Sequence, residues 1–280
     1  MKNCDANTHK KNVTSDKTKF NHHFTQDIMI TRPSKEIDAK SYPYDICVSY
    51  LREVLLTRDD SHGVSHALAV HQNCIELWVD LGEGIRYVEN YDSKREIKTF
   101  LSQGPQGKFT SWFYISASAL LHDVCDHKYH TSDDNVQKFK SFVTDTVCQG
   151  DKDAANIILT IIENVSYSRE KKGLLQKANL PNHIMAMRDI VSDADKIEAL
   201  GEMGIERCIE FTKSRVKKIP DQDQSAYEAL IMKDVSQHCD DKLLHLLPFF
   251  IRTPGGKAMA KPHHDFIVKW QKDWKVDALS

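Results

Sequence analysis

The 280-residue chain lacks the features that would place it in a membrane, a secretory pathway or a complex with nucleic acid. No apolar run approaches the ~20 residues of a membrane-spanning helix. Residues 1–5 are polar and carry no apolar core of a signal peptide. A formal charge of -2 gives the whole chain no electrostatic attraction to nucleic acid or acidic lipids. The sequence therefore predicts a soluble, cytoplasmic protein with no membrane or nucleic-acid partner.

The cysteines also lack a recognisable pattern. Seven is an odd number for a disulfide framework, and no two of them form the Cys-x-x-Cys pair of a thiolate zinc site. Scattered cysteines of this kind are typical of a reducing compartment. The seven residues are Cys4, Cys47, Cys74, Cys125, Cys148, Cys208 and Cys239.

No stretch of useful length alternates apolar and polar residues as a half-buried strand does, and the chain has no internal repeat. From residue 41 onward, apolar residues instead recur at steps of three and four, which predicts helices. Residues 1–40 are polar and are expected to form a flexible tail. Residues 81–108 hold four of the eleven glycines and are interpreted as an inserted segment. The prediction is an all-α fold with a single helical domain over residues 41–280.

The helix expected over residues 112–121 is apolar nearly all round, which is typical of a helix buried in a core, and it ends at a His-Asp pair. Another helix is expected to begin near His62. His71 lies in its apolar stripe, where a hydrogen-bonded core histidine is favoured over a metal ligand. Further helices are expected over residues 135–148 with Ser132 as N-cap, 151–165, 182–200 with Pro181 in the first turn, 227–238, 242–251 and 257–274, with a break at 253–256.

Two imidazoles and two carboxylates stand out in this pattern: His66, His122, Asp123 and Asp195. Divalent metals accept imidazole nitrogen and carboxylate oxygen, and two carboxylates largely neutralise a dication. Adjacent helical residues point about 100° apart, so His122 and Asp123 can share a metal only at a helix end or between them, with other ligands arriving from neighbouring helices. An ionised Asp123 after so apolar a segment needs a partner that offsets its desolvation, and a metal, an arginine or a lysine would serve.

Four segments around these residues carry a family resemblance. They read Asp-x-Ser-His-Gly-x-x-His-x-x-x-Val at 59–70, Ala-Leu-Leu-His-Asp-Val-Cys-Asp-His-Lys-Tyr at 119–129, Ile-Ile-Glu-Asn-Val-Ser-Tyr-Ser at 161–168 and Asp-Ala-Asp-Lys-Ile-Glu-Ala-Leu-Gly at 193–201. Together they resemble the HD-domain superfamily of metal-dependent phosphohydrolases, in particular its small stand-alone YedJ/YpgQ-like branch. The resemblance extends over residues 44–274 and implies an all-helical HD-domain bundle. The metal ligands that it implies are His66, His122, Asp123 and Asp195.

The chain departs from this branch in two places. The stretch between His66 and His122 is longer than in most relatives, which would alter the entrance of the pocket. Gly63 and Ala69 stand where relatives often have Asp and Arg. A substrate contact or a support of the ligands is therefore expected to be missing or replaced.

Two residues that follow the His-Asp pair in the sequence are candidates for catalysis. Asp126 would share the face of Asp123 on a continuing helix. In several HD hydrolases an acidic residue at this offset assists proton transfer or positions water, and the resemblance implies the same role for Asp126. Lys128 could neutralise charge on a phosphoryl group in the transition state. The alternatives are a plain helix-end carboxylate and a solvated lysine.

Other polar residues are candidates for supporting roles. His62 lies one turn before His66 and could line the substrate pocket. Arg207 and Lys242 are candidates for binding phosphate, against the alternative that both are solvated surface charges. Asp193 could stand behind the site and orient a metal ligand or a lysine.

The function predicted from these residues is metal-dependent hydrolysis of a phosphoester or phosphoanhydride bond. By analogy with the family, the substrate is a small phosphorylated molecule, a nucleotide, and the cofactor is one divalent ion: Mn²⁺, Mg²⁺, Co²⁺, Ni²⁺ or Fe²⁺. One alternative is a nucleotide-binding or sensing protein without catalysis. Another is a di-iron oxygenase on the same fold, which His127 and His130 disfavour because they follow Asp123 too closely.

Overall fold

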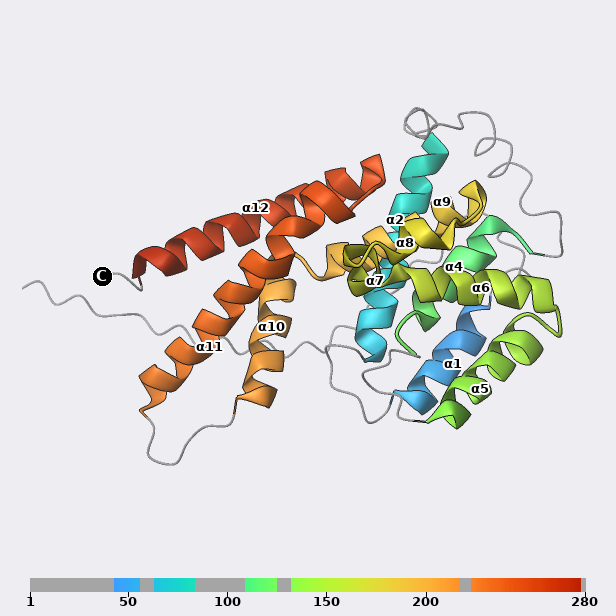
Figure 1. Cartoon of the computed structure of the whole chain (residues 1–280), viewed down its shortest axis with the longest axis horizontal. Helices are drawn as coiled ribbons and strands as arrows, with labels where there is room; N and C mark the ends of the chain where they lie inside the picture. The colour runs from blue at the N-terminus through green and yellow to red at the C-terminus, as the bar shows by residue number, and fades with distance from the viewer. Residues whose placement is uncertain (1–42, 56–62, 84–108, 125–131, 217–222, 278–280) are drawn as a thin grey trace, which may run out of the picture. The chain divides into compact units, whose positions relative to one another are not determined.

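The computed structural model describes residues 43–55, 63–83, 109–124, 132–216 and 223–277, which belong to one unit of the chain. Every regular element within these ranges is a helix, which confirms the predicted all-α class (Figure 1). None of the described helices is long and apolar enough to cross a membrane. Several predictions lie outside the described residues: the tail at 1–40, the inserted segment beyond residue 83, His62, Asp126 and Lys128.

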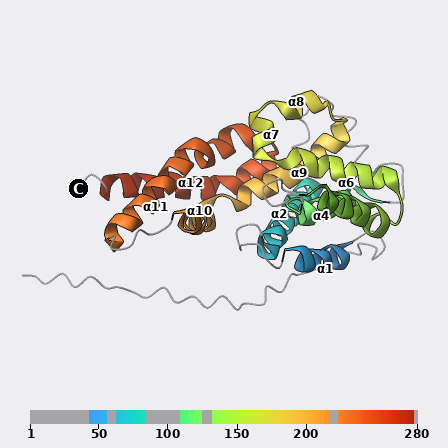
Figure 2. The same cartoon turned by 60° about the horizontal axis from the view of Figure 1, so that its bottom comes forward.

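The core is built around α4 (Ser111–Leu121), in which every residue is buried. Thr110 caps its start, because the Thr110 hydroxyl accepts a hydrogen bond from the Phe113 N–H at 3.3 Å. α1 (Tyr44–Val54) and α2 (Val64–Glu83) pack against it, and the turned view in Figure 2 shows both beside it. The prediction of a helix buried on all sides and ending at the His-Asp pair is confirmed.

Where one helix is predicted over residues 135–148, the chain forms α5 (Asp133–Ser141) and then a π-helical segment (Phe142–Val147). The predicted helix is confirmed over almost its whole length, and its last part is π-helical. The Thr144 hydroxyl donates to a carbonyl one turn back at 2.9 Å, a bond that competes with the regular helical ladder. Ser132 holds the N-cap position of α5, as predicted, but its side chain makes no capping hydrogen bond.

Asp151 is the N-cap of α6 (Lys152–Val165), because its carboxylate accepts hydrogen bonds from two N–H groups of the first turn. This element agrees with the predicted helix. Two short helices that the sequence analysis missed follow it: α7 (Tyr167–Lys171) and α8 (Leu174–Ala178). Gly173 joins them with a φ of 68°, in the left-handed region that favours glycine.

α9 (Asn182–Glu198) is the second central helix and packs against α2, α4 and α6. Its residues 187–194 are all buried, although several of them are polar or charged. Pro181 immediately precedes its first residue, where the missing N–H of a proline costs no helical hydrogen bond. α9 therefore brings polar side chains into the middle of the protein.

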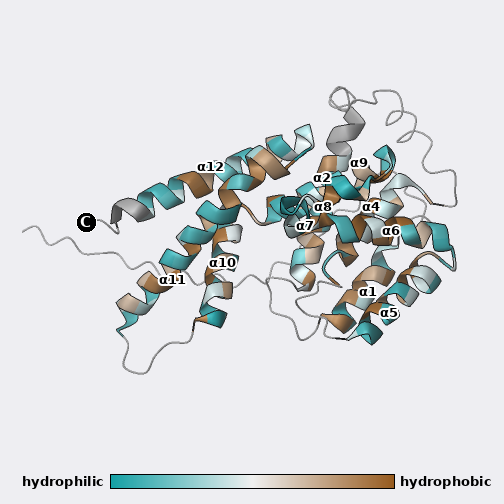
Figure 3. Ribbon diagram, in the orientation of Figure 1, coloured by the Kyte–Doolittle hydropathy of each residue, from teal (hydrophilic) through white to brown (hydrophobic). Residues whose placement is uncertain are grey.

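The chain continues with α10 (Gly201–Arg215) and α11 (Gln224–His238). The helix predicted over residues 242–251 is confirmed, since the chain is helical from 239 to 250. Most of this stretch is π-helical, in the segments Cys239–Leu243 and Leu246–Phe250. Figure 3 shows that α11 carries both hydrophilic and hydrophobic residues along its length.

The last helix, α12 (Pro254–Asp277), starts earlier than predicted. A break is expected at residues 253–256 from its Pro and Gly content, but Pro254 is the first helical residue and Gly255 and Gly256 are helical. A proline is tolerated at this position because the first N–H groups of a helix have no partner within it.

His71 is a structural residue of the core, as predicted. It is buried, and its Nε2 lies 2.9 Å from the Ser116 hydroxyl on α4. Burial lowers the pKa of His71 to about 4, so the ring is neutral at physiological pH.

Candidate metal centre

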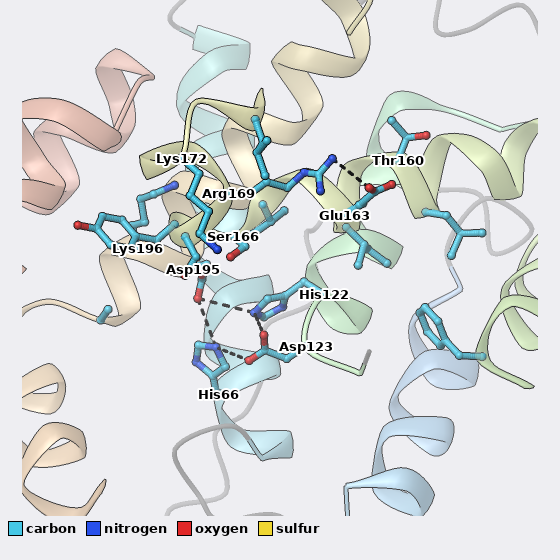
Figure 4. A pocket seen from close by; sticks show the side chains of 18 of the residues that line it. His66, His122, Asp123, Thr160, Glu163, Ser166, Arg169, Lys172, Asp195 and Lys196 are labelled. Carbon is cyan, nitrogen blue, oxygen red and sulfur yellow. Dashed lines mark ion pairs between the residues drawn. The ribbon is translucent and has the colours of Figure 1, made fainter. Parts of the chain in front are cut away.

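The four predicted metal ligands converge from α2, from the turn after α4 and from α9 (Figure 4). His66 Nε2 lies 3.5 Å from Asp123 Oδ2 and 3.4 Å from Asp195 Oδ1. His122 Nε2 lies 3.5 Å from Asp123 Oδ1 and 3.7 Å from the same Asp195 oxygen. Ligand atoms of His66, His122 and Asp195 all lie within 4.8 Å of one another, a group that could hold a metal ion. We call these four residues the metal cluster.

The end of α4 explains how two adjacent residues reach one point. The helix stops at Leu121, and a turn closed by a 3.1 Å hydrogen bond from the Val124 N–H to the Leu121 carbonyl carries the His-Asp pair. His122 Nδ1 donates to the Ala119 carbonyl at 2.8 Å. Because a carbonyl oxygen only accepts, Nδ1 carries a proton, and Nε2 is the atom directed at the carboxylates.

The histidines and aspartates of the metal cluster shift one another's pKa values. Burial lowers the pKa of His66 and prevails over its hydrogen bond with Asp195. Burial also acts on His122, but the charge of Asp123 and the hydrogen bond and charge of Asp195 outweigh it and raise the pKa of His122 to about 9. Against the effect of burial, both imidazoles hold the pKa of Asp195 well below its usual range. The cluster therefore keeps Asp195 ionised and attracts a cation.

The metal cluster lies in the wall of a cavity of about 840 Å³, a size suited to a small-molecule ligand. Most of the charged side chains that line the rest of this cavity are positive. Figure 4 shows Lys172 extending toward the cluster and Arg169 extending toward Glu163. The cationic residues that line the cavity are Lys140, Arg169, Lys172, Lys196, Arg207 and Lys242.

Comparison with known proteins agrees with this geometry. No protein-family model matches the chain. The uncharacterised protein YpgQ of Bacillus subtilis is 28% identical over 167 residues, which are 59% of this chain and 72% of YpgQ. A crystal structure of B. subtilis YpgQ in complex with ADP matches with a TM-score of 0.51 and 19% identity, covering 84% of this chain and 94% of that chain. The chain has the YpgQ-like HD-domain fold.

Two further crystal structures have a fold similar to that of this chain. A protein from Lactobacillus plantarum matches with a TM-score of 0.60 and 19% identity, covering 87% of this chain and 99% of that chain. An HD-superfamily hydrolase from Bacillus thuringiensis matches with a TM-score of 0.53 and 18% identity, covering 85% and 97% of the two chains. The resemblance predicted from the four sequence segments is thereby confirmed.

Both cations predicted to bind substrate line the cavity of this HD-domain fold. Nη1 of Arg207, on α10, lies 3.5 Å from the Glu198 carbonyl oxygen and 3.7 Å from Glu198 Oε1. Lys242 places Nζ 5.4 Å from the centre of the Tyr167 ring. Their predicted role in phosphate binding stays a proposal. His62 and the catalytic candidates Asp126 and Lys128 lie outside the described residues.

Asp193 is buried on α9 and anchors the start of α12. Its carboxylate accepts hydrogen bonds from the Arg252 N–H at 2.9 and 3.1 Å and from the Thr253 N–H at 2.6 Å. A Cβ atom added at Gly256 would lie 2.6 Å from Asp193 Oδ2, so the close approach requires glycine. Burial raises the pKa of Asp193 to about 6, although its hydrogen bond with Thr253 and the positive charge of Lys196 act to lower it. The predicted role of Asp193 in orienting a metal ligand or a lysine stays a prediction, whereas the anchoring of α12 is new.

The sequence analysis missed four cavity cations: Lys140, Arg169, Lys172 and Lys196. A signal for two of them was present, because Arg169 and Lys172 directly follow the segment at 161–168 and stand three residues apart, as neighbours on one helix face do. Lys140 carried no comparable signal. It is one of several exposed charges on α5, and only the packing of α5 beside the cavity distinguishes it.

Proposed function

We propose that the protein is a metal-dependent phosphohydrolase that cleaves a phosphoester or phosphoanhydride bond of a nucleotide. One observation carries this proposal: two imidazoles and two carboxylates face one another in the wall of a cavity whose other charged side chains are mostly cations. The cluster offers a site for a positive ion, and the surrounding cations offer a site for a negative ligand. A phosphorylated substrate bridging the two satisfies both.

The metal cluster fits a divalent ion. Its donors are two imidazole nitrogens and two carboxylates, a set that binds Mn²⁺, Fe²⁺, Co²⁺ or Ni²⁺ well. His122 Nε2 is buried and faces carboxylate oxygens of Asp123 and Asp195 at 3.5 and 3.7 Å, so a metal ion among these atoms would bind it directly. The Ala119 carbonyl already fixes the orientation of the ring, as supporting groups do for metal-bound histidines.

A metal ion bound by His66, His122, Asp123 and Asp195 would supply a Lewis acid and an acidified water. The protein's own contribution is to orient the substrate and to balance its charge. Arg169, Lys172, Arg207 and Lys242 line the cavity and would hold the phosphate oxygens and offset the charge that develops on them. Asp126 and Lys128 remain the candidates for moving a proton and for neutralising the phosphoryl group.

The nucleotide assignment rests on two observations. B. subtilis YpgQ, which shares this fold, has been crystallised with ADP. The cavity also combines its cations with apolar and amide side chains such as Leu159, Val136 and Asn156, which suit the uncharged part of a nucleotide.

The test is a nucleotide panel with identification of the products, run with Mn²⁺, Mg²⁺, Co²⁺ and Ni²⁺ in turn. We expect about one bound metal per chain by metal analysis and release of phosphate or pyrophosphate from at least one nucleotide. Asp123→Ala should abolish both. Activity that persists in this variant or after exhaustive chelation would contradict the proposal.

The same experiment separates the two alternatives. Thermal stabilisation by a nucleotide without any turnover would favour a sensing protein. Two bound irons with activity that depends on O₂ would favour the oxygenase.

A further inference from the structure

One buried carboxylate holds the short helix α7 in place. With five residues, α7 is well below the ~12 residues at which an isolated helix becomes marginally stable, so contacts with the rest of the protein determine its position. Glu170 is its buried residue, and the Glu170 side chain is 1% exposed. The other charged residues of this segment reach solvent or the cavity.

Glu170 is bound by cations from two other parts of the chain. On α9, Arg188 forms an ion pair with Glu170 Oε1, and Lys196 Nζ donates to the same oxygen at 2.9 Å. The Ser192 hydroxyl donates to it at 3.2 Å. From the segment before α12, Arg252 NH2 lies 3.6 Å from Glu170 Oε2. Because Arg188 and Lys196 are themselves buried, these interactions are stronger than ion pairs in water.

The burial of Glu170 sets the rotation of α7 about its own axis. Successive helical residues point about 100° apart, so a helix whose Glu170 faces α9 turns its flanking residues to other directions. Arg169 and Lys172 then line the cavity, whereas Lys171 lies with its Nζ 5.7 Å from the centre of the Tyr167 ring. The burial of Glu170 thus favours the rotation of α7 at which Arg169 and Lys172 line the cavity, where Arg169 also pairs with Glu163 at 3.0 Å.

The same carboxylate ties α7 to the helix that carries a metal ligand. Lys196, which donates to Glu170, directly follows Asp195. The ion pair between Glu170 and Lys196 therefore fixes α7 and the residue after it, Lys172, relative to Asp195. A shift of α7 along α9 would break this ion pair.

We propose that Glu170 is a positioning residue, which holds Arg169 and Lys172 where they contact the phosphate groups of the substrate. This role rests on the proposed function, because it assumes a phosphorylated ligand beside the metal cluster. Glu170 acts through the two cations, since its carboxylate is engaged by the cations of α9 and by Arg252.

The test measures binding of inorganic pyrophosphate to the Mn²⁺-loaded protein by isothermal titration calorimetry. Glu170→Gln keeps the size of the side chain and removes its charge. We expect it to weaken pyrophosphate binding by about tenfold, because charge-assisted contacts of Arg169 and Lys172 are misplaced. The Mn²⁺ affinity should stay unchanged, because packing against α2, α4 and α6 holds α9. The matched control Lys171→Ala removes a cation of the same helix and should leave pyrophosphate binding as it is.

Non-additivity separates positioning from a general loosening of the fold. In an Arg169→Ala/Lys172→Ala background, Glu170→Gln should have no further effect on pyrophosphate binding. A further tenfold loss in that background overturns the proposal, and so does wild-type binding by Glu170→Gln alone. Should Glu170→Gln fail to fold, Glu170→Asp takes its place, with weaker pyrophosphate binding at unchanged Mn²⁺ affinity as the expected result.

The outcomes also distinguish the two proposals. A wild-type protein that binds Mn²⁺ but no pyrophosphate contradicts the proposed function. A wild-type protein that binds pyrophosphate, with Glu170→Gln equal to it, contradicts the positioning role alone.

Discussion

Two groups of charged residues share α9 and have opposite character. In the metal cluster, each carboxylate faces two imidazoles. In the second group the carboxylates face guanidinium and ammonium groups, which donate hydrogen bonds and have no lone pair to offer a metal when charged. We call this second group the Glu170 network, and it consists of Glu170, Arg188, Asp189, Lys196 and Arg252.

The carboxylates of the two groups also differ in their exposure to solvent. The carboxylates of Glu170 and Asp189 are each 1% exposed, whereas those of Asp123 and Asp195 are 20% and 29% exposed. The two carboxylates of the Glu170 network are closed to solvent and face cations of the protein, so they act by holding segments of the structure in place. The metal cluster is open to the cavity and offers nitrogen and oxygen donors, so it can take an ion. The type of partner and the access of solvent thus separate the structural carboxylates from those of the metal cluster.

The sharpest way to break this comparison is to remove a carboxylate from the metal cluster. Asp195→Asn should lower metal-dependent hydrolysis by about 1,000-fold or more, because the ion loses a charged ligand. Its free energy of unfolding in the metal-free form should stay within about 1 kcal/mol of the wild type, since a partly exposed carboxylate is lost. Turnover, metal content and urea unfolding are the three measurements. A large loss of stability would make the cluster structural as well.

Removal of a cation from the Glu170 network should lower stability and leave metal binding almost unchanged. Arg188→Met is expected to lower the free energy of unfolding by about 3–5 kcal/mol, because Glu170 and Asp189 lose a buried partner. Urea unfolding monitored by circular dichroism measures this loss. The metal affinity of the folded variant should change little. An equally stable Arg188→Met would show that the network adds no net stability.

His71 and His122 sharpen the comparison as two buried imidazoles with different partners. His71 faces a hydroxyl, and burial lowers its pKa to about 4. An unfolded chain, with a histidine pKa near 6.5, binds this proton between about pH 6.5 and 4 while the folded protein does not. Stability should therefore fall as the pH drops through this window, by up to about 3 kcal/mol from His71. His71→Gln, which can keep a hydrogen bond to Ser116, should make the measured fall shallower.

The protonation of His122 should affect the affinity for the metal ion, and this effect is the smallest of those predicted here. Its pKa is raised to about 9, so below that pH a metal ion must displace a proton from the ring. The apparent Mn²⁺ affinity should rise by up to about tenfold per pH unit between pH 6 and 8. Calorimetric titrations in buffers of different ionisation enthalpy would count the released protons. An affinity that does not depend on pH would contradict a site in which His122 Nε2 binds the metal.

The fold and the metal cluster could be predicted because local patterns encode them. Residues 112–121 are apolar all round, so their burial follows from composition, and the His-Asp pair after them follows from sequence order. His71 could be placed in the core because it shares an apolar helical stripe. The burial of these residues follows from the period of a helix, whereas the choice of His66 and Asp195 as further ligands also rests on the resemblance to HD-domain proteins.

The features that sequence reasoning missed depend on contacts between distant segments. Glu170 lies in a run of polar residues that is typical of an exposed loop, and its burial depends on Arg188 and Arg252. The π-helical segment at residues 142–147 is an exception, because the bond of the Thr144 hydroxyl that competes with its backbone is local, to Lys140. The early start of α12 at Pro254 depends on Asp193, which accepts the preceding N–H groups.

The anchoring of residues 252–253 on Asp193 bears on the order of events during protein synthesis. A ribosome delivers the chain from its N-terminus, so His66, Asp123 and Asp195 are all made before the segment that satisfies Asp193 and adds Arg252 to Glu170. A nascent chain arrested before residue 252 would carry every metal ligand and the α9 partners of Glu170, but Asp193 would lack its two N–H donors and Glu170 would lack Arg252. The polar contacts behind the site are therefore completed late in translation, after every metal ligand has been made.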